Sequence, residues 1–309
     1  MSRFHLLGPI YLVSLTWHSD ADADELDENS RSYQTHAVKK SPVRKMTPPT
    51  ETEEKDPQFA YTLARGLEVL RAFEGQSAGL GNRDIAAIIG IPRSTVARLT
   101  RTLGMLGYLQ YDAPTARYRL SAAMLTLAYP VLAQLPVRQV ARPHMQELAN
   151  HATGSVSLAM RDGLQLVLIE SCVGPKAVTR PDIGAVRGMA DTALGMAYLA
   201  SLAQPDRDAL MAELLALMPS ASASARRHRK SVIQAELQRH ASLGFCLSRS
   251  ELGATLAVAV PVRLQASMTL SLNCVVATHL ATEKRMTQEI GPRLARLARD
   301  FELSMGHKT

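Results

Sequence analysis

The stretch IPRSTVARLTRTLGMLGYL, residues 91–109, combines an apolar repeat with arginine and hydroxyl side chains. Placed on a helix, its apolar residues follow the i, i+3, i+7, i+10 spacing of one buried stripe: Val96, Leu99, Leu103 and Leu106. At about 100° per residue, the opposite side carries a different set: Ser94, Ala97, Arg98, Arg101 and Met105. Pro92 suits the first helical turn, and Gly107 can end the helix. The segment predicts a short helix with an apolar back and a cationic front, a pattern that an ordinary surface helix also shows.

The residues on either side decide between these interpretations. Upstream, residues 82–90 (NRDIAAIIG) predict a short helix capped by Asn82 and ended by Gly90, at the spacing of a helix-turn-helix. Before it, a further helix is predicted with one apolar face formed by Leu63, Leu67, Leu70 and Phe73. Downstream, residues 107–112 and 117–121 read as two strands of a hairpin, separated by residues 113–116. Three helices followed by such a wing make a winged helix-turn-helix.

A helix-turn-helix places its second helix in the major groove of double-stranded DNA. We therefore expect Arg98 and Arg101 to project toward the bases, while hydroxyl groups at the helix start suit phosphates. Two wing arginines alternate with Tyr118 and Leu120, so both should point to one side and contact phosphates; for Arg119 a solvated strand edge is the alternative. The predicted DNA-binding residues are Arg93, Ser94, Thr95, Arg98, Arg101, Thr102, Arg117 and Arg119.

The motifs GLEVLRAF, RDIAAIIGIPRSTVARLTRTL, GYL and YRLS resemble the DNA-binding half of the IclR-type transcriptional regulators. The resemblance continues through RPHMQELANHATGSVSLAMRDG, IGAVRGMADTALGMAYLA and LGFCLSRSELGATLAVAVPV, so that it spans roughly residues 59–305. It implies an α+β fold, in which a winged helix-turn-helix at 58–120 is joined by a linker helix at 121–136 to a GAF-like effector-binding domain with an antiparallel sheet at 137–306. It also implies a homodimer, and often a tetramer through the effector domains.

Composition agrees with a two-domain regulator. The chain has 309 residues, a net charge of +7 and a pI of about 9.5, which suits a polyanionic partner. The charge does not locate the site, because residues 56–120 carry only +3, whereas residues 121–309 carry +6 and residues 1–55 carry −2. No apolar run reaches the ~20 residues of a membrane span. We interpret residues 1–57 as a disordered N-terminal extension, with Met46 as an alternative start.

The three cysteines, Cys172, Cys246 and Cys274, are far apart and belong to no Cys/His cluster. We therefore expect no metal or cofactor, and buried reduced thiols in a cytoplasmic protein. The sequence also lacks a nucleophile elbow and a phosphate-binding loop, and His144 and His151 share a helix face without a third ligand, so we do not expect an enzyme.

In the second half, residues 121–136 predict the linker helix, with Pro130 expected to kink or split it. A helix ending at Thr153-Gly154 precedes a hairpin whose turn is Asp162-Gly163. Further helices are expected at 188–203, 205–218, 226–243 and 283–305, and two more strands at 255–263 and 267–276. The mixture indicates an α+β domain.

By resemblance, a small molecule binds between the sheet and the adjoining loops and helix. The implied effector-binding residues are Ser155, Ser157, Met189, Ala190, Leu194, Gly195, Ser248, Glu251 and Asn273. The chain departs from the family pattern at Ser155-Val156, around Glu251 and at 263–267, so the effector's identity is not inherited. Relatives respond to small organic and aromatic acids, and Arg180 or Arg187 can pair with a carboxylate. The alternative is a constitutive DNA-bound dimer without ligand response.

Overall fold

The fold is described from a computed structural model over residues 58–76, 78–218, 222–250, 252–264 and 268–305. The expected disorder of residues 1–57 and the candidate effector contact Glu251 lie outside the described residues. Among those described, no helix is long and apolar enough to cross a bilayer.

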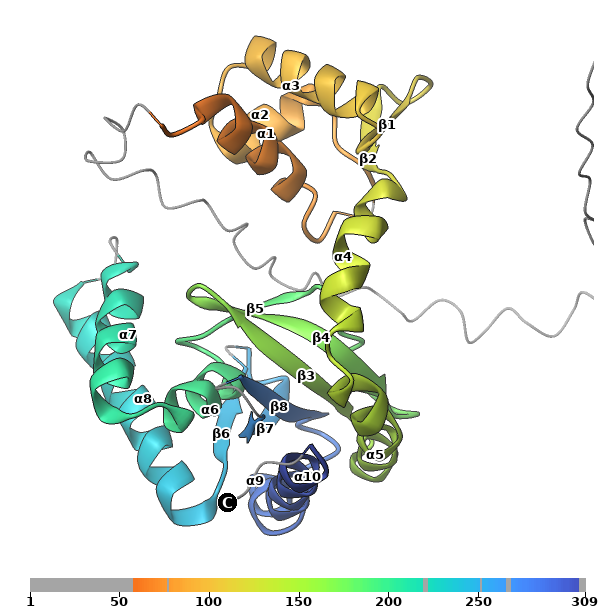
Figure 1. Cartoon of the computed structure of the whole chain (residues 1–309). Helices are drawn as coiled ribbons and strands as arrows, with labels where there is room; N and C mark the ends of the chain where they lie inside the picture. The colour runs from red at the N-terminus through yellow and green to blue at the C-terminus, as the bar shows by residue number, and fades with distance from the viewer. Residues whose placement is uncertain (1–57, 77, 219–221, 251, 265–267, 306–309) are drawn as a thin grey trace, which may run out of the picture. The chain divides into compact units, whose positions relative to one another are not determined.

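The N-terminal part of the described chain is a winged helix-turn-helix, as the sequence predicts (Figure 1). Its elements are α1 (Tyr61–Arg71), α2 (Asn82–Ile89), α3 (Arg93–Met105), β1 (Leu109–Asp112) and β2 (Arg117–Leu120). The two wing strands pair antiparallel, and Leu80 adds a bridge to Tyr118. A small core lies between these elements, formed by Val69, Ala72, Phe73, Leu80, Ile85, Val96, Leu99 and Leu109.

Two local predictions in this region are wrong. Asn82 does not cap α2, because Gly81 precedes the helix and its N–H donates to the Asp84 carboxylate at 3.1 Å. The Asn82 side chain instead accepts a hydrogen bond of 3.0 Å from the hydroxyl of Thr100, which is fully buried between α2 and α3. Leu106 is 63% exposed, because α3 has already ended at Met105 and Gly107 turns the chain with a φ of +80°.

The apolar face expected on α1 is only partly covered by this domain. Phe73 is buried and Leu70 is half-buried, whereas Leu63 and Leu67 are 64% and 49% exposed. The first half of that face is thus left uncovered by the described part of the chain.

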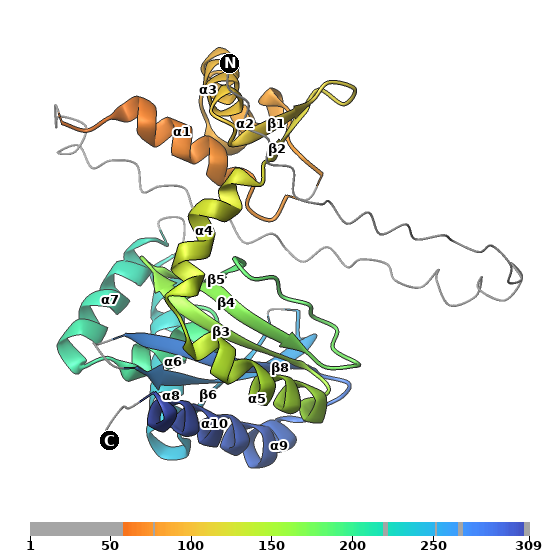
Figure 2. The ribbon, with the colours of Figure 1, turned by 45° about the vertical axis from the view of Figure 1, so that its right-hand side comes forward.

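The C-terminal part is built on a six-stranded antiparallel sheet in the order β5-β4-β3-β8-β7-β6 (Figure 2). Its strands are β3 (Ser155–Asp162), β4 (Gln165–Val173), β5 (Val186–Gly188), β6 (Cys246–Arg249), β7 (Thr255–Arg263) and β8 (Thr269–Ala277). The hairpin between β3 and β4 is confirmed, but its two turn residues are Gly163 and Leu164, since Asp162 still pairs with Gln165. The short edge strands β5 and β6 are absent from the sequence prediction.

Helices cover both faces of this sheet (Figure 1). The helices of this part are α5 (Val137–Ala152), α6 (Ala193–Ser201), α7 (Gln204–Ala216), α8 (Ala223–Leu243), α9 (Glu283–Arg285) and α10 (Gly291–Ser304), with a π-helical turn at Met286–Ile290. The linker helix α4 (Ala123–Ala133) precedes them. Helices α5 and α10 share one apolar cluster with the sheet, and α6, α7 and α8 share another on the opposite face.

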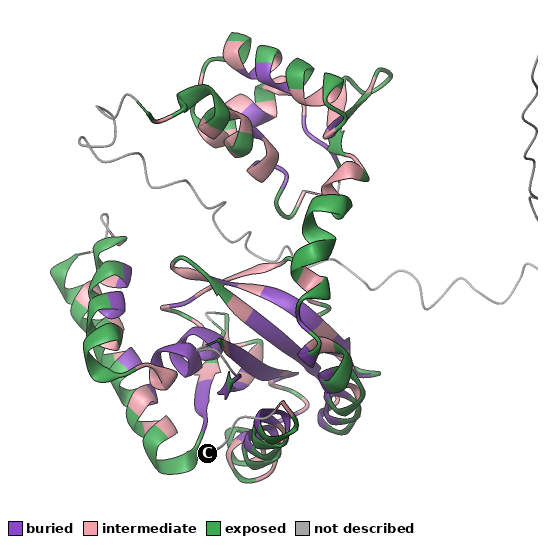
Figure 3. Cartoon of the chain, viewed as in Figure 1, coloured by how far each residue is buried: buried purple, intermediate pink, exposed green. Residues whose placement is uncertain are grey.

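The linker helix α4 has no buried residue along its eleven positions, a property it shares only with the three-residue α9 among the described helices (Figure 3). It runs through Pro130 and ends at Ala133, so Pro130 does not split it; the break before α5 falls at residues 134–136. The single helix expected at 188–203 is also wrong at its start, because Val186–Gly188 forms β5 and Thr192 caps α6 by accepting a hydrogen bond from the Gly195 N–H at 3.2 Å.

Candidate DNA-binding surface and effector site

Helix α3 has a front and a back, as its sequence pattern predicts. Val96, Leu99 and Thr100 anchor its back in the domain core. Most of the predicted DNA contacts lie on the exposed front, namely Arg93, Ser94, Arg98, Arg101 and Thr102, and Thr95 is half-buried. Within the described part of the chain, no ion pair involves these three arginines. Their guanidinium groups are therefore available to an anionic partner.

The two wing arginines lie on the same side of β2 but in different circumstances. Both side chains approach Gly79. A Cβ atom placed on this glycine would lie 3.1 Å from Arg119 Cγ and 3.5 Å from Arg117 Cβ. Arg117 donates to the Gly79 carbonyl at 2.8 Å and lies 3.4 Å from the Asp84 carboxylate. Arg119 is exposed. Arg117 thus joins the wing to the start of α2, whereas Arg119 is accessible to solvent.

The candidate effector residues on the strands lie on the α6-facing side of the sheet. Val156, Leu272 and Cys274 pack with α5 and α10, so their neighbours Ser157 and Asn273 point the opposite way. Ser157 pairs in register with both Asn273 and Ser171, and its hydroxyl lies 3.4 Å from that of Ser171. A row of polar side chains therefore crosses three adjacent strands beneath α6.

Two buried polar atoms on this face lack a hydrogen-bond partner within the described residues: Ser271 Oγ and Asn273 Oδ1. An unpaired buried polar atom is costly, and in native proteins it often marks the place of a water molecule or ligand. Ser271 and Ser171 are missing from the sequence-based set. The alternation in TLSLNCVV, where Ser271 and Asn273 alternate with Leu270, Leu272 and Cys274, is the signal that points to Ser271.

Other candidates have a structural explanation of their own. Ser155 Oγ lies 2.9 Å from Thr179 Oγ1, and Ser248 Oγ accepts a hydrogen bond from the Ala193 N–H at 3.1 Å, at the start of α6. A Cβ on Gly195 would lie 1.9 Å from the Met189 carbonyl oxygen, so only glycine fits there. The remaining candidates also lie at the start of α6: Met189 and Leu194 are buried and Ala190 is half-buried.

Of the two arginines considered as carboxylate partners, only Arg187 has a place on this face. It pairs in register with Leu166, which packs with α6, whereas Arg180 is exposed in the loop before β5. Burial lowers the pKa of the Arg187 guanidinium from its ordinary value, and the Asp182 carboxylate opposes that shift. Arg161 lies in the same row, with its guanidinium carbon 5.6 Å from the centre of the Tyr198 ring.

The three cysteines are all free and buried. Burial raises the pKa of the Cys274 thiol to about 12, and burial likewise raises the pKa of Cys172 and Cys246. The thiolate is the reactive form of cysteine. At neutral pH these side chains therefore act as small apolar groups in the core.

A winged helix-turn-helix followed by an α+β sensor-like domain defines a class of DNA-binding transcriptional regulators. The chain matches the IclR helix-turn-helix domain over residues 62–113 and the C-terminal domain of IclR bacterial transcriptional regulators over residues 129–303. It therefore belongs to the IclR family of transcriptional regulators.

Individual relatives agree with this assignment. The HTH-type transcriptional regulator TsaQ1/TsaQ2 of Comamonas testosteroni is 31% identical over 268 residues, covering 83% of this chain and 92% of the relative. An IclR family regulator from Brucella abortus has a similar crystal structure, with 34% identity, a TM-score of 0.68 and coverage of 82% of this chain and 95% of that chain. An IclR homologue from Microbacterium hydrocarbonoxydans, complexed with 4-hydroxybenzoate, shares the fold at 20% identity and a TM-score of 0.63, covering 80% of this chain and 100% of that one.

Proposed function

We propose that the chain binds operator DNA through residues 58–120 and that a small molecule in residues 137–306 modulates this binding. The cationic front of α3 is the observation that carries the DNA-binding surface. Arg98 and Arg101 contact base edges, Arg119 contacts a phosphate, and Arg117 supports the wing. The other predicted contacts bind phosphates: Arg93, Ser94 and Thr95 at the start of α3, and Thr102 in its last turn.

The unpaired polar atoms of Ser271 and Asn273 support the effector site. A ligand beneath α6 supplies the hydrogen bonds that these two atoms lack, and Ser157 and Ser171 lie in the same polar group. Arg187 on the same face favours an organic or aromatic acid, because a guanidinium pairs bidentately with a carboxylate. Neither proposal requires a metal, a cofactor or an enzymatic step, and a regulator of this kind acts in the cytoplasm.

The exposed apolar residues of α1 and α4 support a homodimer through the DNA-binding half. Leu63 and Leu67 on α1 are joined on α4 by Leu125, Leu127, Tyr129 and Val131, which are 50–70% exposed. A single winged helix buries only about 600–1,000 Å² on DNA, and two copies on half-sites about one helical turn apart provide specificity. A tetramer through the effector domains is the further possibility that family resemblance suggests.

The DNA-binding proposal is tested by selecting sites for the full chain from a randomised DNA pool. Selection of a palindrome-like site, with sedimentation as a dimer or larger at micromolar concentration, is expected. A strictly monomeric chain, or one that selects no DNA, contradicts the proposal.

The effector proposal is tested by thermal shift with benzoate, 4-hydroxybenzoate and aliphatic carboxylates. A ligand that binds only the folded chain raises its apparent stability, by about 2.7 kcal/mol at 100 times its Kd. A bound acid should also change the affinity for the selected DNA. If no acid shifts the melting temperature while DNA binding persists, the alternative of a constitutive DNA-bound dimer holds. The hydrogen bonds that already engage Ser155 and Ser248 favour that alternative.

A further inference from the structure

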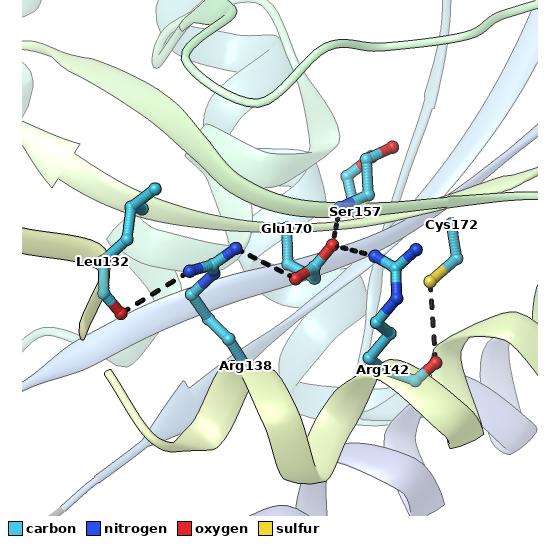
Figure 4. A network of polar contacts seen from close by, with 7 residues as sticks. Leu132, Arg138, Arg142, Ser157, Glu170 and Cys172 are labelled. Atoms are coloured by element: carbon cyan, nitrogen blue, oxygen red, sulfur yellow. Dashed lines mark hydrogen bonds and ion pairs between the residues drawn. The ribbon is translucent and has the colours of Figure 1, made fainter. Parts of the chain in front are cut away.

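A buried carboxylate joins helix α5 to the sheet on the face opposite the candidate effector site (Figure 4). The Glu170 side chain is 4% exposed and forms ion pairs with Arg142 at 2.6 Å and with Arg138 at 3.2 Å. Both arginines come from α5, one helical turn apart. Removing a charge from such a buried group leaves the remaining partner uncompensated, so this arrangement holds the first turns of α5 firmly against β4.

Glu170 is also connected to the effector face of the sheet. Its Oε1 accepts a hydrogen bond of 3.0 Å from the N–H of Ser171, whose hydroxyl lies 3.4 Å from that of Ser157 on the α6-facing side. A β-bulge interrupts the register of β3 and β4 between Leu158 and Ala159, next to this point. Bulges re-aim side chains and frequently lie beside functional sites. A ligand that displaces Ser171 therefore displaces the backbone group that holds the Glu170 carboxylate.

Arg138 continues this connection to the linker helix. Its Nη1 donates to the Leu132 carbonyl at 3.5 Å, one residue before the end of α4 at Ala133. Its Nε is buried without a hydrogen-bond partner within the described residues. Arg142 has no such contact with α4; its backbone carbonyl instead accepts from the Cys172 thiol. Of the two arginines, Arg138 alone thus contacts both Glu170 and the linker.

We propose that Glu170 and Arg138 are positioning residues that couple the effector face to the linker helix α4. The inference rests on the proposed function, in which α4 connects the effector domain to the DNA-binding domain. Arg138 links the last turn of α4 to β4 through its contacts with the Leu132 carbonyl and the Glu170 carboxylate. A shift of Ser171 and Glu170 on ligand binding moves or releases Arg138, and with it the end of the linker helix. Such a two-state contact is the kind of element through which one site biases another.

The two arginines provide a matched test, because each substitution removes one ion pair to Glu170 and only one removes a contact with the linker. Hydrogen exchange of amides 132–135 is measured in the full chain without DNA, together with affinity for the selected DNA. Arg138→Met is expected to raise exchange there about tenfold and to weaken DNA binding at least about fivefold, in the usual range of coupling. Arg142→Met is expected to leave both within about twofold. Equal effects of the two variants, or none from Arg138→Met, overturn the proposal.

If Arg138→Met does not fold, Arg138→Lys replaces it. Lysine keeps the charge near Glu170 but lacks the planar fork that reaches two acceptors at once, so the same direction of change is expected. Unchanged exchange in this variant contradicts the proposal.

A double-mutant cycle tests the connection to the effector face. Ser157→Val alters that face without contacting Glu170, and it should change exchange at the end of α4 in the wild-type background but not in Arg138→Met. Additive effects refute the coupling. If the wild-type chain selects no DNA, the proposed function fails, whereas the exchange measurements still decide the coupling because they need no DNA.

Discussion

The two faces of the six-stranded sheet carry very different side chains. Toward α5 and α10, the central strands present large apolar residues: Leu158, Val258, Val260, Leu270 and Leu272. Toward α6, the same strands present small or polar ones: Ser157, Ala257, Ala259, Ser271 and Asn273. The first face is a packed core. On the second face the side chains are smaller, and two buried polar atoms have no hydrogen-bond partner within the described residues, as expected of the proposed effector site.

The largest effect should come from the apolar face. Leu272→Ala removes a fully buried side chain, and we expect it to lower the free energy of unfolding by about 2–5 kcal/mol. Denaturant unfolding of the full chain measures this loss. A cost below about 1 kcal/mol would remove the distinction between the two faces, since packing would then matter little on either.

Helix α3 repeats the division on a smaller scale, with its buried back and its cationic front. Arg98→Ala and Arg101→Ala should each weaken binding to the selected DNA by about 1–3 kcal/mol, because an arginine on a guanine edge discriminates by that amount. Their melting temperatures should match that of the wild type. Unchanged affinity for both variants, measured across several salt concentrations, would show that α3 is not the recognition helix.

A substitution on the polar face should affect ligand binding rather than stability, the reverse of what is expected for Leu272→Ala. Asn273→Leu replaces an amide whose Oδ1 is buried without a hydrogen-bond partner among the described residues by an apolar group of similar size, so we expect stability to change by no more than about 1 kcal/mol, in either direction. Any thermal shift with carboxylates should disappear. A strong loss of stability without ligand would instead make Asn273 part of the core, and the contrast between the faces would fail there.

The smallest effects are expected in the wing. There the comparison is between Arg117, which stabilises the wing, and Arg119, which is proposed to bind DNA. Arg119→Ala should reduce the slope of log affinity against log salt by about one unit, equally for all DNA sequences. Arg117→Ala should cost about 0–1 kcal/mol of stability, since its ion pair with Asp84 is partly exposed. The reverse assignment, with the salt slope changing only in Arg117→Ala, would mean that the wing rearranges on DNA.

The spacing of apolar residues and the turn residues were enough to predict those helices, strands and turns that are determined by residues close together in the sequence. The winged helix-turn-helix, the β3–β4 hairpin and the α+β class are all visible in local patterns, such as the stripe from Val96 to Leu103 and the glycine at 163. Contacts between distant positions were not predictable. Nothing in the sequence tells that Thr100 bonds to Asn82 or that Glu170 pairs with Arg138, because such pairings depend on which helices become neighbours.

Part of the candidate site was likewise predictable from local sequence patterns, and part was not. The front of α3 follows from spacing alone, whereas the effector residues came from family resemblance. The strands β5 and β6 are too short, at three and four residues, to produce a recognisable alternation. Arg187 therefore could not be placed on the α6 face until its pairing with Leu166 was known.

The bulge in β4 has a consequence for how this strand tolerates changes in length. Leu158 pairs with Glu170 and Ala159 pairs with Leu168, so Ile169 is an extra residue without a pairing partner on β3. Deleting Ile169 would shorten the chain by one residue yet leave every remaining pair in β3 and β4 opposite its present partner. Ser157 and Ser171 would stay on the α6 side of the sheet and Glu170 on the α5 side. The change would cost one buried isoleucine side chain. Elsewhere in a strand, deleting one residue moves the following side chains to the other face of the sheet. At Ile169, the deletion would change only the local twist of the strand.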